Sequence, residues 1–163
     1  MLVQDARSPM VHSSAKLSSC RHYRYTLARV WDASGPTVMF VGLNPSTADA
    51  KINDATVRRC IGFAQSWGFG KLILTNLFAF RSTDPIALRD VRDPVGPYND
   101  HWIVESSRTA DLTVVAWGIH GRLHERDHDV LSQLNEPRCL GKTKSGAPRH
   151  PLYLRADSPL QLF

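Results

Sequence analysis

Three nearly continuous apolar runs constrain the fold of this chain more than any other feature of its sequence. They read TVMFVGL at 37–43, KLILTNLF at 71–78 and DLTVVAW at 111–117. A strand with one solvated face would alternate polar and apolar residues, so these runs indicate strands that are covered on both faces. Because helical patterns separate the runs, we expect an α/β fold: a three-layer α/β/α sandwich with a central, mainly parallel sheet.

The segments between the runs predict the remaining elements of the domain. Apolar residues recur at helical spacing between Asp54, a suitable N-cap, and Gly68, a suitable C-cap. Three more helices and one strand are expected further along the chain: a short helix opening at 84–85, helices over 99–110 and 122–134, and a short strand over 138–140.

The N-terminal part of the chain is expected to have two different structures. Residues 1–20 mix serine, proline, histidine and alanine without a period, which predicts a flexible tail. Residues 23–31 alternate as in a half-buried strand, and turn residues at 32–35 lead into the first apolar run, so a β-hairpin is expected there. Residues 21–163 are expected to form a single α/β/α domain.

Composition narrows the class of partner. Lys and Arg number 20 against 15 Asp and Glu, a formal net charge of +5, which favours nucleic acid or another polyanion. No apolar run is long enough to cross a bilayer, and the first ten residues lack the apolar stretch of a signal peptide, so we expect a cytoplasmic protein without a membrane partner. The three cysteines have neither metal-ligand nor redox spacing, so they are expected to be buried or idle thiols, and an iron–sulfur cluster would need four. No cofactor is expected.

Polar residues follow the predicted strands where a ligand would bind. In sheets of this kind the ligand crevice lies beyond the carboxyl ends of the parallel strands. The segment Gly42-Leu43-Asn44-Pro45-Ser46 follows the first run, and Asn76 lies near the end of the second. A carboxamide there needs partners, which are either backbone groups or a ligand edge with one carbonyl and one N–H, such as a nucleobase presents.

A histidine near the C-terminus is the third candidate. His150 lies between two prolines in the basic segment Pro148-Arg149-His150-Pro151-Leu152. Such a histidine either donates to a carbonyl or a phosphate, or is an ordinary surface histidine in a stiff loop.

In this order the three segments resemble the motifs of the uracil-DNA glycosylase superfamily. Gly42-Leu43-Asn44-Pro45 is similar to its glycine-x-acid/amide-proline turn, in the asparagine version of the mismatch-specific members. Asn76 matches the asparagine that reads a flipped uracil, and His150-Pro151 matches the histidine-proline motif on the loop that enters the DNA groove. GLNPSTAD and PRHPLY also resemble an uncharacterised bacterial family of unknown function. Ser46 and Leu152 depart from the superfamily pattern.

The resemblance implies a uracil-DNA glycosylase-like fold and a nucleobase-binding hydrolase that cleaves the N-glycosidic bond of a modified or mismatched base. Asn44 would hold the attacking water, His150 would stabilise charge on the base oxygen, and a carboxylate, Asp49 or Asp54, would assist. The base would be contacted by residues of both strand ends: Asn76, Phe78, Gly42, Pro45 and Ser46. Nucleic acid, DNA in preference to RNA, or a nucleotide would meet the nearby cations: Arg81, Lys142, Lys144 and Arg149.

Two other functions remain open from the sequence. The first is a non-catalytic module that binds nucleotides or nucleic acid. The second is a zinc hydrolase, because His124-Glu125-Arg126-Asp127-His128 matches the HExxH pattern on the helix predicted over 122–134. Polar residues between the histidines and the lack of an obvious third ligand favour a solvated helix over a zinc site.

Overall fold

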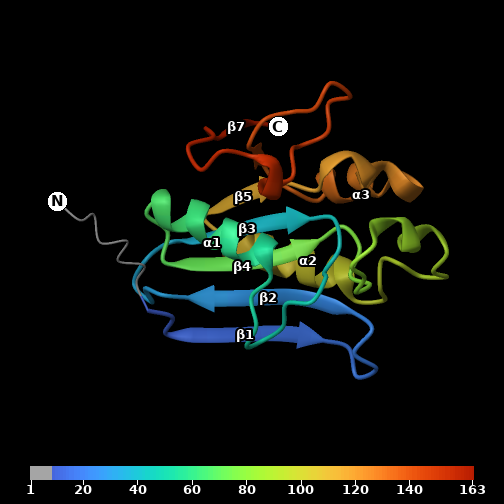
Figure 1. Ribbon diagram of the computed structural model, residues 1–163, viewed down its shortest axis with the longest axis horizontal. Coiled ribbons are helices and arrows are strands. Elements are labelled where there is room, and N and C mark those ends of the chain that lie inside the picture. The colour runs from blue at the N-terminus through green and yellow to red at the C-terminus, as the bar shows by residue number, and fades with distance from the viewer. Residues whose placement is uncertain (1–8) are drawn as a thin grey trace.

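In the computed structural model, which describes residues 9–163, seven strands form one mixed sheet (Figure 1). In chain order the strands of this described part are β1 (His12–Leu17), β2 (Arg24–Val30), β3 (Thr37–Gly42), β4 (Lys71–Asn76), β5 (Leu112–Val115), β6 (Arg138–Cys139) and β7 (Gln161–Leu162). They lie in the order β1-β2-β4-β3-β5-β6-β7. The four central strands are parallel, and antiparallel strands flank them on both sides, so the expected α/β class is confirmed.

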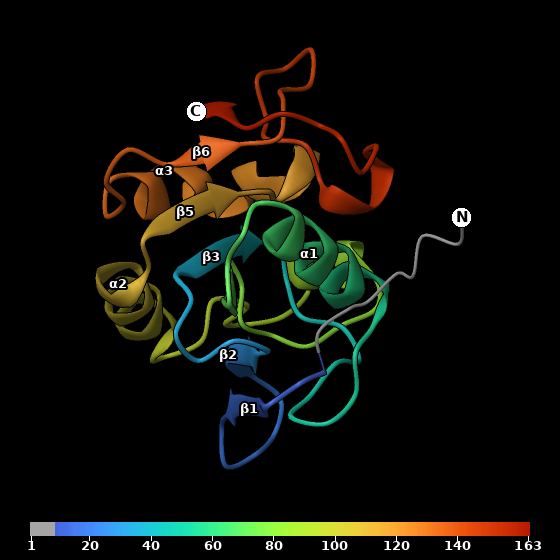
Figure 2. The ribbon, with the colours of Figure 1, turned by 90° about the vertical axis from the view of Figure 1, so that its left-hand side faces the viewer.

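Helices lie on both faces of this sheet. They are α1 (Ala55–Ser66), α2 (Asn99–Thr109) and α3 (Arg126–Leu131), with the 3-10 helices η1 (Pro85–Arg89), η2 (Gly118–Glu125) and η3 (Pro151–Tyr153). Helix α1 covers one face, whereas α2 and α3 lie against the other (Figure 2). The N-cap predicted for α1 is present, since the side chain of Asp54 accepts a hydrogen bond from the N–H of Val57. The C-cap is Trp67, and Gly68, the predicted cap, follows it with a left-handed φ of 83°.

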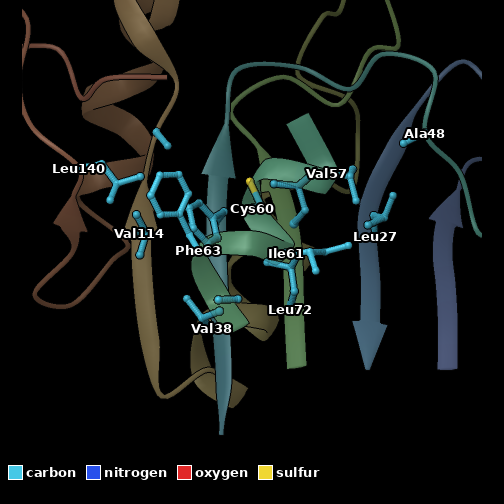
Figure 3. Packing of buried hydrophobic residues seen from close by; sticks show 14 of the residues in the cluster. Leu27, Val38, Ala48, Val57, Cys60, Ile61, Phe63, Leu72, Val114 and Leu140 are labelled. Carbon is cyan, nitrogen blue, oxygen red and sulfur yellow. The ribbon is translucent and has the colours of Figure 1, made fainter. Parts of the chain in front are cut away.

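Alternation along β3 explains why its sequence is apolar throughout. Val38 and Phe40 point into the core beneath α1, where they meet Phe63 and other residues of that helix (Figure 3). Met39 and Val41 point the other way, into the core beneath α2 and α3. Because both faces are covered, neither set of side chains meets water. Burial of each of these side chains stabilises the fold by about 1.5–3 kcal/mol.

The predicted hairpin between residues 23–31 and the first apolar run is wrong. Strand β2 pairs antiparallel with β4, with Leu27 opposite Leu74, and β4 separates β2 from β3. Strand β4, which follows α1, pairs parallel with β3 along the edge that a hairpin would have given to β2. Strand β2 therefore pairs with the opposite edge of β4.

The tail predicted over 1–20 is also wrong in part. Residues 12–17 form β1, an edge strand that pairs antiparallel with β2, whereas residues 1–8 lie outside the described part. The sequence HSSAKL has little apolar period, so backbone pairing with β2 defines this strand rather than its side-chain pattern.

The helix predicted over 122–134 is interrupted at the HExxH match. His124 and Glu125 have φ values of 55° and 54°, in the left-handed region, so the motif spans the end of η2 and the start of α3. The two histidines of the motif therefore do not lie on successive turns of one helix, as a zinc site of this kind needs. Within residues 9–163 no group of three or more His, Cys, Asp or Glu side chains is placed to hold a metal ion. Within the same range no helix has both the length and the apolar character to span a membrane.

Candidate functional site

The sequence-predicted residues gather where the parallel strands end. Gly42 at the end of β3 pairs with Asn76 at the end of β4, and the N–H of Leu77 donates to the carbonyl of Gly42. Strand β5 lies on the other side of β3 and leads into Gly118. The arrowheads of β3 and β4 point to the same edge in Figure 1, and the loops after them gather there. This edge holds the strand-end site, which we define as Asn44, Asn76 and His150.

Asn44 is fixed through its amide nitrogen. Its Nδ2 donates to the carbonyls of Ser82 at 2.8 Å and of Pro45 at 3.1 Å. Two carbonyl acceptors fix which end of the carboxamide is nitrogen. Within residues 9–163 no side chain or backbone group donates to Oδ1, and the residue is half-buried. The side-chain oxygen of Asn44, Oδ1, is therefore free to accept a hydrogen bond from water.

Asn76 carries a buried donor without a partner. The residue is only 4% exposed, and its Nδ2 makes no hydrogen bond within residues 9–163. Its Oδ1 lies against Gly42, where a Cβ would come within 2.7 Å of it. Within residues 9–163 no backbone carbonyl therefore accepts a hydrogen bond from Nδ2, the arrangement that the structural alternative would need. It is one of five buried side-chain nitrogen and oxygen atoms in the described part of the chain that have no hydrogen-bond partner, and a ligand acceptor that reached it would satisfy it.

His150 lies beside the end of β5. The N–H of Gly118 donates to the carbonyl of Pro148 at 2.8 Å, and a Cβ on Gly118 would lie 3.6 Å from the Cβ of His150. The imidazole caps η3, because its Nδ1 accepts a hydrogen bond from the N–H of Leu152 at 3.3 Å. Burial lowers the pKa of His150 below 6.5, and the charge of Asp54 partly opposes this shift. At neutral pH the ring is therefore neutral with its proton on Nε2, which makes Nε2 a donor.

The two carboxylates considered from the sequence have different surroundings. Asp49 closes its own loop, because its Oδ1 accepts from the N–H groups of Lys51 and Ile52 at 2.8 Å each. These backbone bonds are the main reason that the pKa of Asp49 is lowered. Asp54 caps α1, and its charge acts on His150. Of the two, Asp54 is the carboxylate that influences the strand-end site.

Residues 24–152 match a family model described as protein of unknown function (DUF1643). The chain belongs to the DUF1643 family. The match includes the three segments of the strand-end site. No curated protein and no solved structure matches the chain. The description of the DUF1643 family assigns no activity.

Two buried residues that the sequence did not single out hold the peptide after β4 in the DUF1643 domain. Asn99, at the start of α2, donates from Nδ2 to the carbonyls of Asn76 at 2.9 Å and Leu77 at 3.0 Å. Arg126 donates from Nε to the same carbonyl of Leu77 at 2.8 Å and forms an ion pair with Asp100. These bonds fix the backbone that carries Asn76. Nothing in the sequence distinguishes Asn99 from an ordinary first residue of a helix.

Two buried arginines of β2 hold the loop that follows Asn44. Within the described part of the chain Arg29 donates five hydrogen bonds, and the acceptors include the carbonyls of Asp49 and Ile52 and the side-chain oxygen of Asn53. Arg24 donates to the carbonyl of Ala48 at 2.8 Å, and burial lowers its pKa to about 10. Arginine is rarely buried without partners, so two on one half-apolar strand are the sequence signal that could have indicated this role.

The remaining predicted base-contacting residues differ in access. Phe78 is fully buried in the core beneath α2 and α3, so it is not available to stack on a base. Phe80, two residues further along and not among the predicted contacts, is half-buried and packs edge-on against Tyr23. Pro45 is buried, whereas Ser46 is partly exposed at the start of the loop.

The predicted cations lie on both sides of the strand-end site. Lys142, Lys144 and Arg149 are exposed on the basic hairpin, residues 141–149, which the N–H of Thr143 closes by donating to the carbonyl of Ala147. This hairpin projects from the top of the molecule in Figure 1. Arg81 lies beyond the end of β4, on the other side of the site, where its N–H donates to the carbonyl of His22.

Proposed function

We propose that this DUF1643 protein binds a nucleobase in the strand-end site and hydrolyses the N-glycosidic bond of a modified or mismatched base. The observation that carries the proposal is the unpaired, buried Nδ2 of Asn76. A buried donor without a partner costs about 1–3 kcal/mol. A carbonyl oxygen of a bound base would remove this cost, so the domain binds best a ligand that offers an acceptor to Asn76.

The spacing of the site suits a single base. Asn76 is the last residue of β4 and His150 lies beside the end of β5, with β3 between these strands. Neighbouring strands are about 4.8 Å apart, which separates the backbones of β4 and β5 by roughly 10 Å. A pyrimidine or purine ring with a hydrogen bond at either edge spans such a gap. Asn76 then reads one edge of the base, and Nε2 of His150 donates to an oxygen at the other.

The same residues support the chemistry of hydrolysis. A water molecule held by Oδ1 of Asn44 forms the new bond to the sugar carbon as the bond to the base nitrogen breaks. The bonding electrons leave with the base, and the hydrogen bond from His150 stabilises the charge that develops on its oxygen. One proton of the water stays on the new sugar hydroxyl, and the other passes to solvent or to the departing base. The ordered motifs that resemble the uracil-DNA glycosylase superfamily support the same reaction.

Nucleic acid is the proposed carrier of the base. The cations of the basic hairpin lie on one side of the site and Arg81 on the other, where a phosphate backbone can meet them. Leu152 and Tyr153, which directly follow His150 and Pro151, are 41% and 85% exposed. An exposed aromatic ring at this position offers a surface on which a neighbouring base can stack. Such contacts offset the few kcal/mol that turning a base out of a stack costs.

Release of a free base tests the proposal. The protein is incubated with single-stranded and duplex DNA that contains one uracil or one mismatched base, and the abasic sites formed are cleaved and counted. We expect slow release that falls about 100-fold or more in His150→Gln. Asn44→Ala lowers it as well. The exposed residues Asn135 and His128 provide the matched controls Asn135→Ala and His128→Gln, which keep the wild-type rate.

A second candidate function follows from the chemistry of Asn44. A carboxamide is a poor general base, which favours a non-catalytic module that binds a nucleotide or nucleic acid through the same residues. Binding that depends on Asn76, together with no base release from any of these substrates, would select this second function over the first.

A further inference from the structure

A groove beside the strand-end site has no role in the reaction proposed above. It lies between η1 and η2 and has a volume of about 140 Å³. The residues that line it are Pro85, Ile86, Leu88, Arg89, Ile119, His120, Arg122 and Leu123. Whole ligand pockets usually measure about 300–1,000 Å³, so this η1–η2 groove suits one ring or one phosphate rather than a separate large ligand.

Both walls of the groove start at residues that support the strand-end site. The N–H of Ser82 donates to the carbonyl of Pro45, and the carbonyl of Ser82 accepts from Asn44, only three residues before η1 begins. The other wall, η2, begins at Gly118, the neighbour of His150. The η1–η2 groove is therefore adjacent to the place where the proposed base binds.

The groove combines exposed apolar side chains with positive charge. Ile86 and Ile119 are 59% and 60% exposed, although both are apolar. Arg89 and Arg122 line the same groove, and none of its lining residues, all of which the structure describes, is acidic. A nucleotide has the complementary chemistry, since a flat apolar ring is joined to a negative phosphate.

Arg122 also connects the η1–η2 groove to the basic hairpin. Its Nη2 donates to the carbonyl of Ser145 at 2.8 Å, and its side chain lines a second, smaller pocket together with Pro148 and Phe163. The positive charge of the hairpin thus continues through Arg122 to Arg89.

We infer that the η1–η2 groove holds the nucleotide next to the one in the strand-end site, with its base against Ile86 and Ile119 and its phosphate at Arg89 and Arg122. The inference rests on the proposed function, because it assumes that the base in the strand-end site belongs to a single-stranded polynucleotide. It adds that the protein recognises more than one nucleotide of that strand.

The test compares fluorescently labelled thymidine oligomers of one and three nucleotides, whose affinities are measured by fluorescence anisotropy. The wild-type protein is expected to bind the trinucleotide more tightly. Arg89→Gln and Ile119→Ser each remove most of this difference, a loss of about five- to tenfold in affinity, and leave the mononucleotide unaffected. All of these positions are exposed, so the variants are expected to fold, which a melting curve checks.

Two matched controls are available in the same chain. Arg92→Gln removes the same charge three residues along from Arg89, and Ile52→Ser alters an isoleucine that is also 60% exposed, but neither residue lines the groove. Both controls should bind the trinucleotide as the wild type does. If the groove variants keep the full gain from one to three nucleotides, or if no thymidine oligomer binds, the groove inference is wrong. The proposed function is tested separately by base release from DNA that contains uracil or a mismatched base, so the two failures are distinguishable.

Discussion

At Gly42 the absence of a side chain decides where the carboxamide of Asn76 can lie. A Cβ there would come within 2.7 Å of Oδ1 of Asn76, well inside van der Waals contact. We expect Gly42→Ala to displace this carboxamide, to abolish base selection and to lower stability by about 1–3 kcal/mol, as other insertions into packed sites do.

Gly62 is the matched control for this substitution. It is an exposed residue of α1, and a Cβ there would meet nothing within 4 Å. Gly62→Ala should therefore raise stability by about 0.5–1 kcal/mol and leave binding unchanged. Urea unfolding measures the stability of both variants. Equal changes in stability at the two positions would contradict the close approach of Asn76 to Gly42.

The ionisation of His150 predicts how stability depends on pH. Because burial holds its pKa in the folded state below 6.5, the unfolded state binds a proton first as the pH falls. Stability is therefore lost as the pH drops through 6.5, until the pH reaches the lower folded value. His150→Gln should show a smaller loss of stability than the wild type between pH 7.5 and 5.

Asp54→Asn tests whether the charge of Asp54 acts on the pKa of His150. Asparagine also caps helices well, so α1 should keep its N-cap. The variant removes the charge that opposes the effect of burial, so the pKa of His150 should fall further. An NMR titration of the imidazole measures the change, and a rise in this pKa would contradict the described arrangement.

At the scale of elements, the loop between β3 and α1 is held both by its own Asp49 and by Arg29 of β2. The guanidinium of Arg29 donates hydrogen bonds to three oxygen atoms of this loop, and the ammonium group of a lysine cannot reproduce all of them. We expect Arg29→Lys to lower the free energy of unfolding by about 2–3 kcal/mol and to expose residues 46–53 to proteolysis. Arg92→Lys, at an exposed position, is the control and should do neither.

The elements also show what the sequence could predict. The apolar runs were sufficient for β3, β4 and β5, and helical spacing with the Asp54 cap was sufficient for α1, because periodicity and local hydrogen bonds determine them. Strand pairing was not predictable in the same way. Strand β2 pairs with β4 rather than with β3, and this pairing depends on the order of all the strands in the sheet. The break at His124 was missed because a polar segment carries little periodic signal.

At the scale of the molecule, the order of the parallel strands brings distant residues together. The placement of Asn44 and Asn76 at one edge was predictable, because parallel strands end on the same side of a sheet. The unpaired Nδ2 of Asn76, the hydrogen bonds from Asn99 and the burial of Phe78 depend on packing in three dimensions, and within the described residues none of them follows from a pattern in the sequence.

The positive charge of the basic hairpin predicts that the affinity for single-stranded DNA depends on salt concentration. Lys142 and Lys144 lie on a hairpin that projects from the sheet, and replacing both with glutamine should weaken binding to all single-stranded DNA sequences alike. Because each phosphate contact releases counterions, the slope of log affinity against log salt should become flatter by about one to two units. An unchanged slope would exclude the hairpin from the nucleic-acid interface.

The most direct test of base recognition is to observe the side-chain amide of Asn76 itself. The ¹⁵N-labelled protein is titrated with single-stranded trinucleotides that differ only in the central base, and the side-chain NH₂ signal that is lost in Asn76→Asp is followed. The NH₂ of Asn99, whose donors already bond to the carbonyls of Asn76 and Leu77, serves as the internal control. The account predicts a downfield shift of the Asn76 signal that depends on the central base, with a smaller change at Asn99. Saturating binding with no shift at Asn76, or an equal shift for every central base, would contradict it.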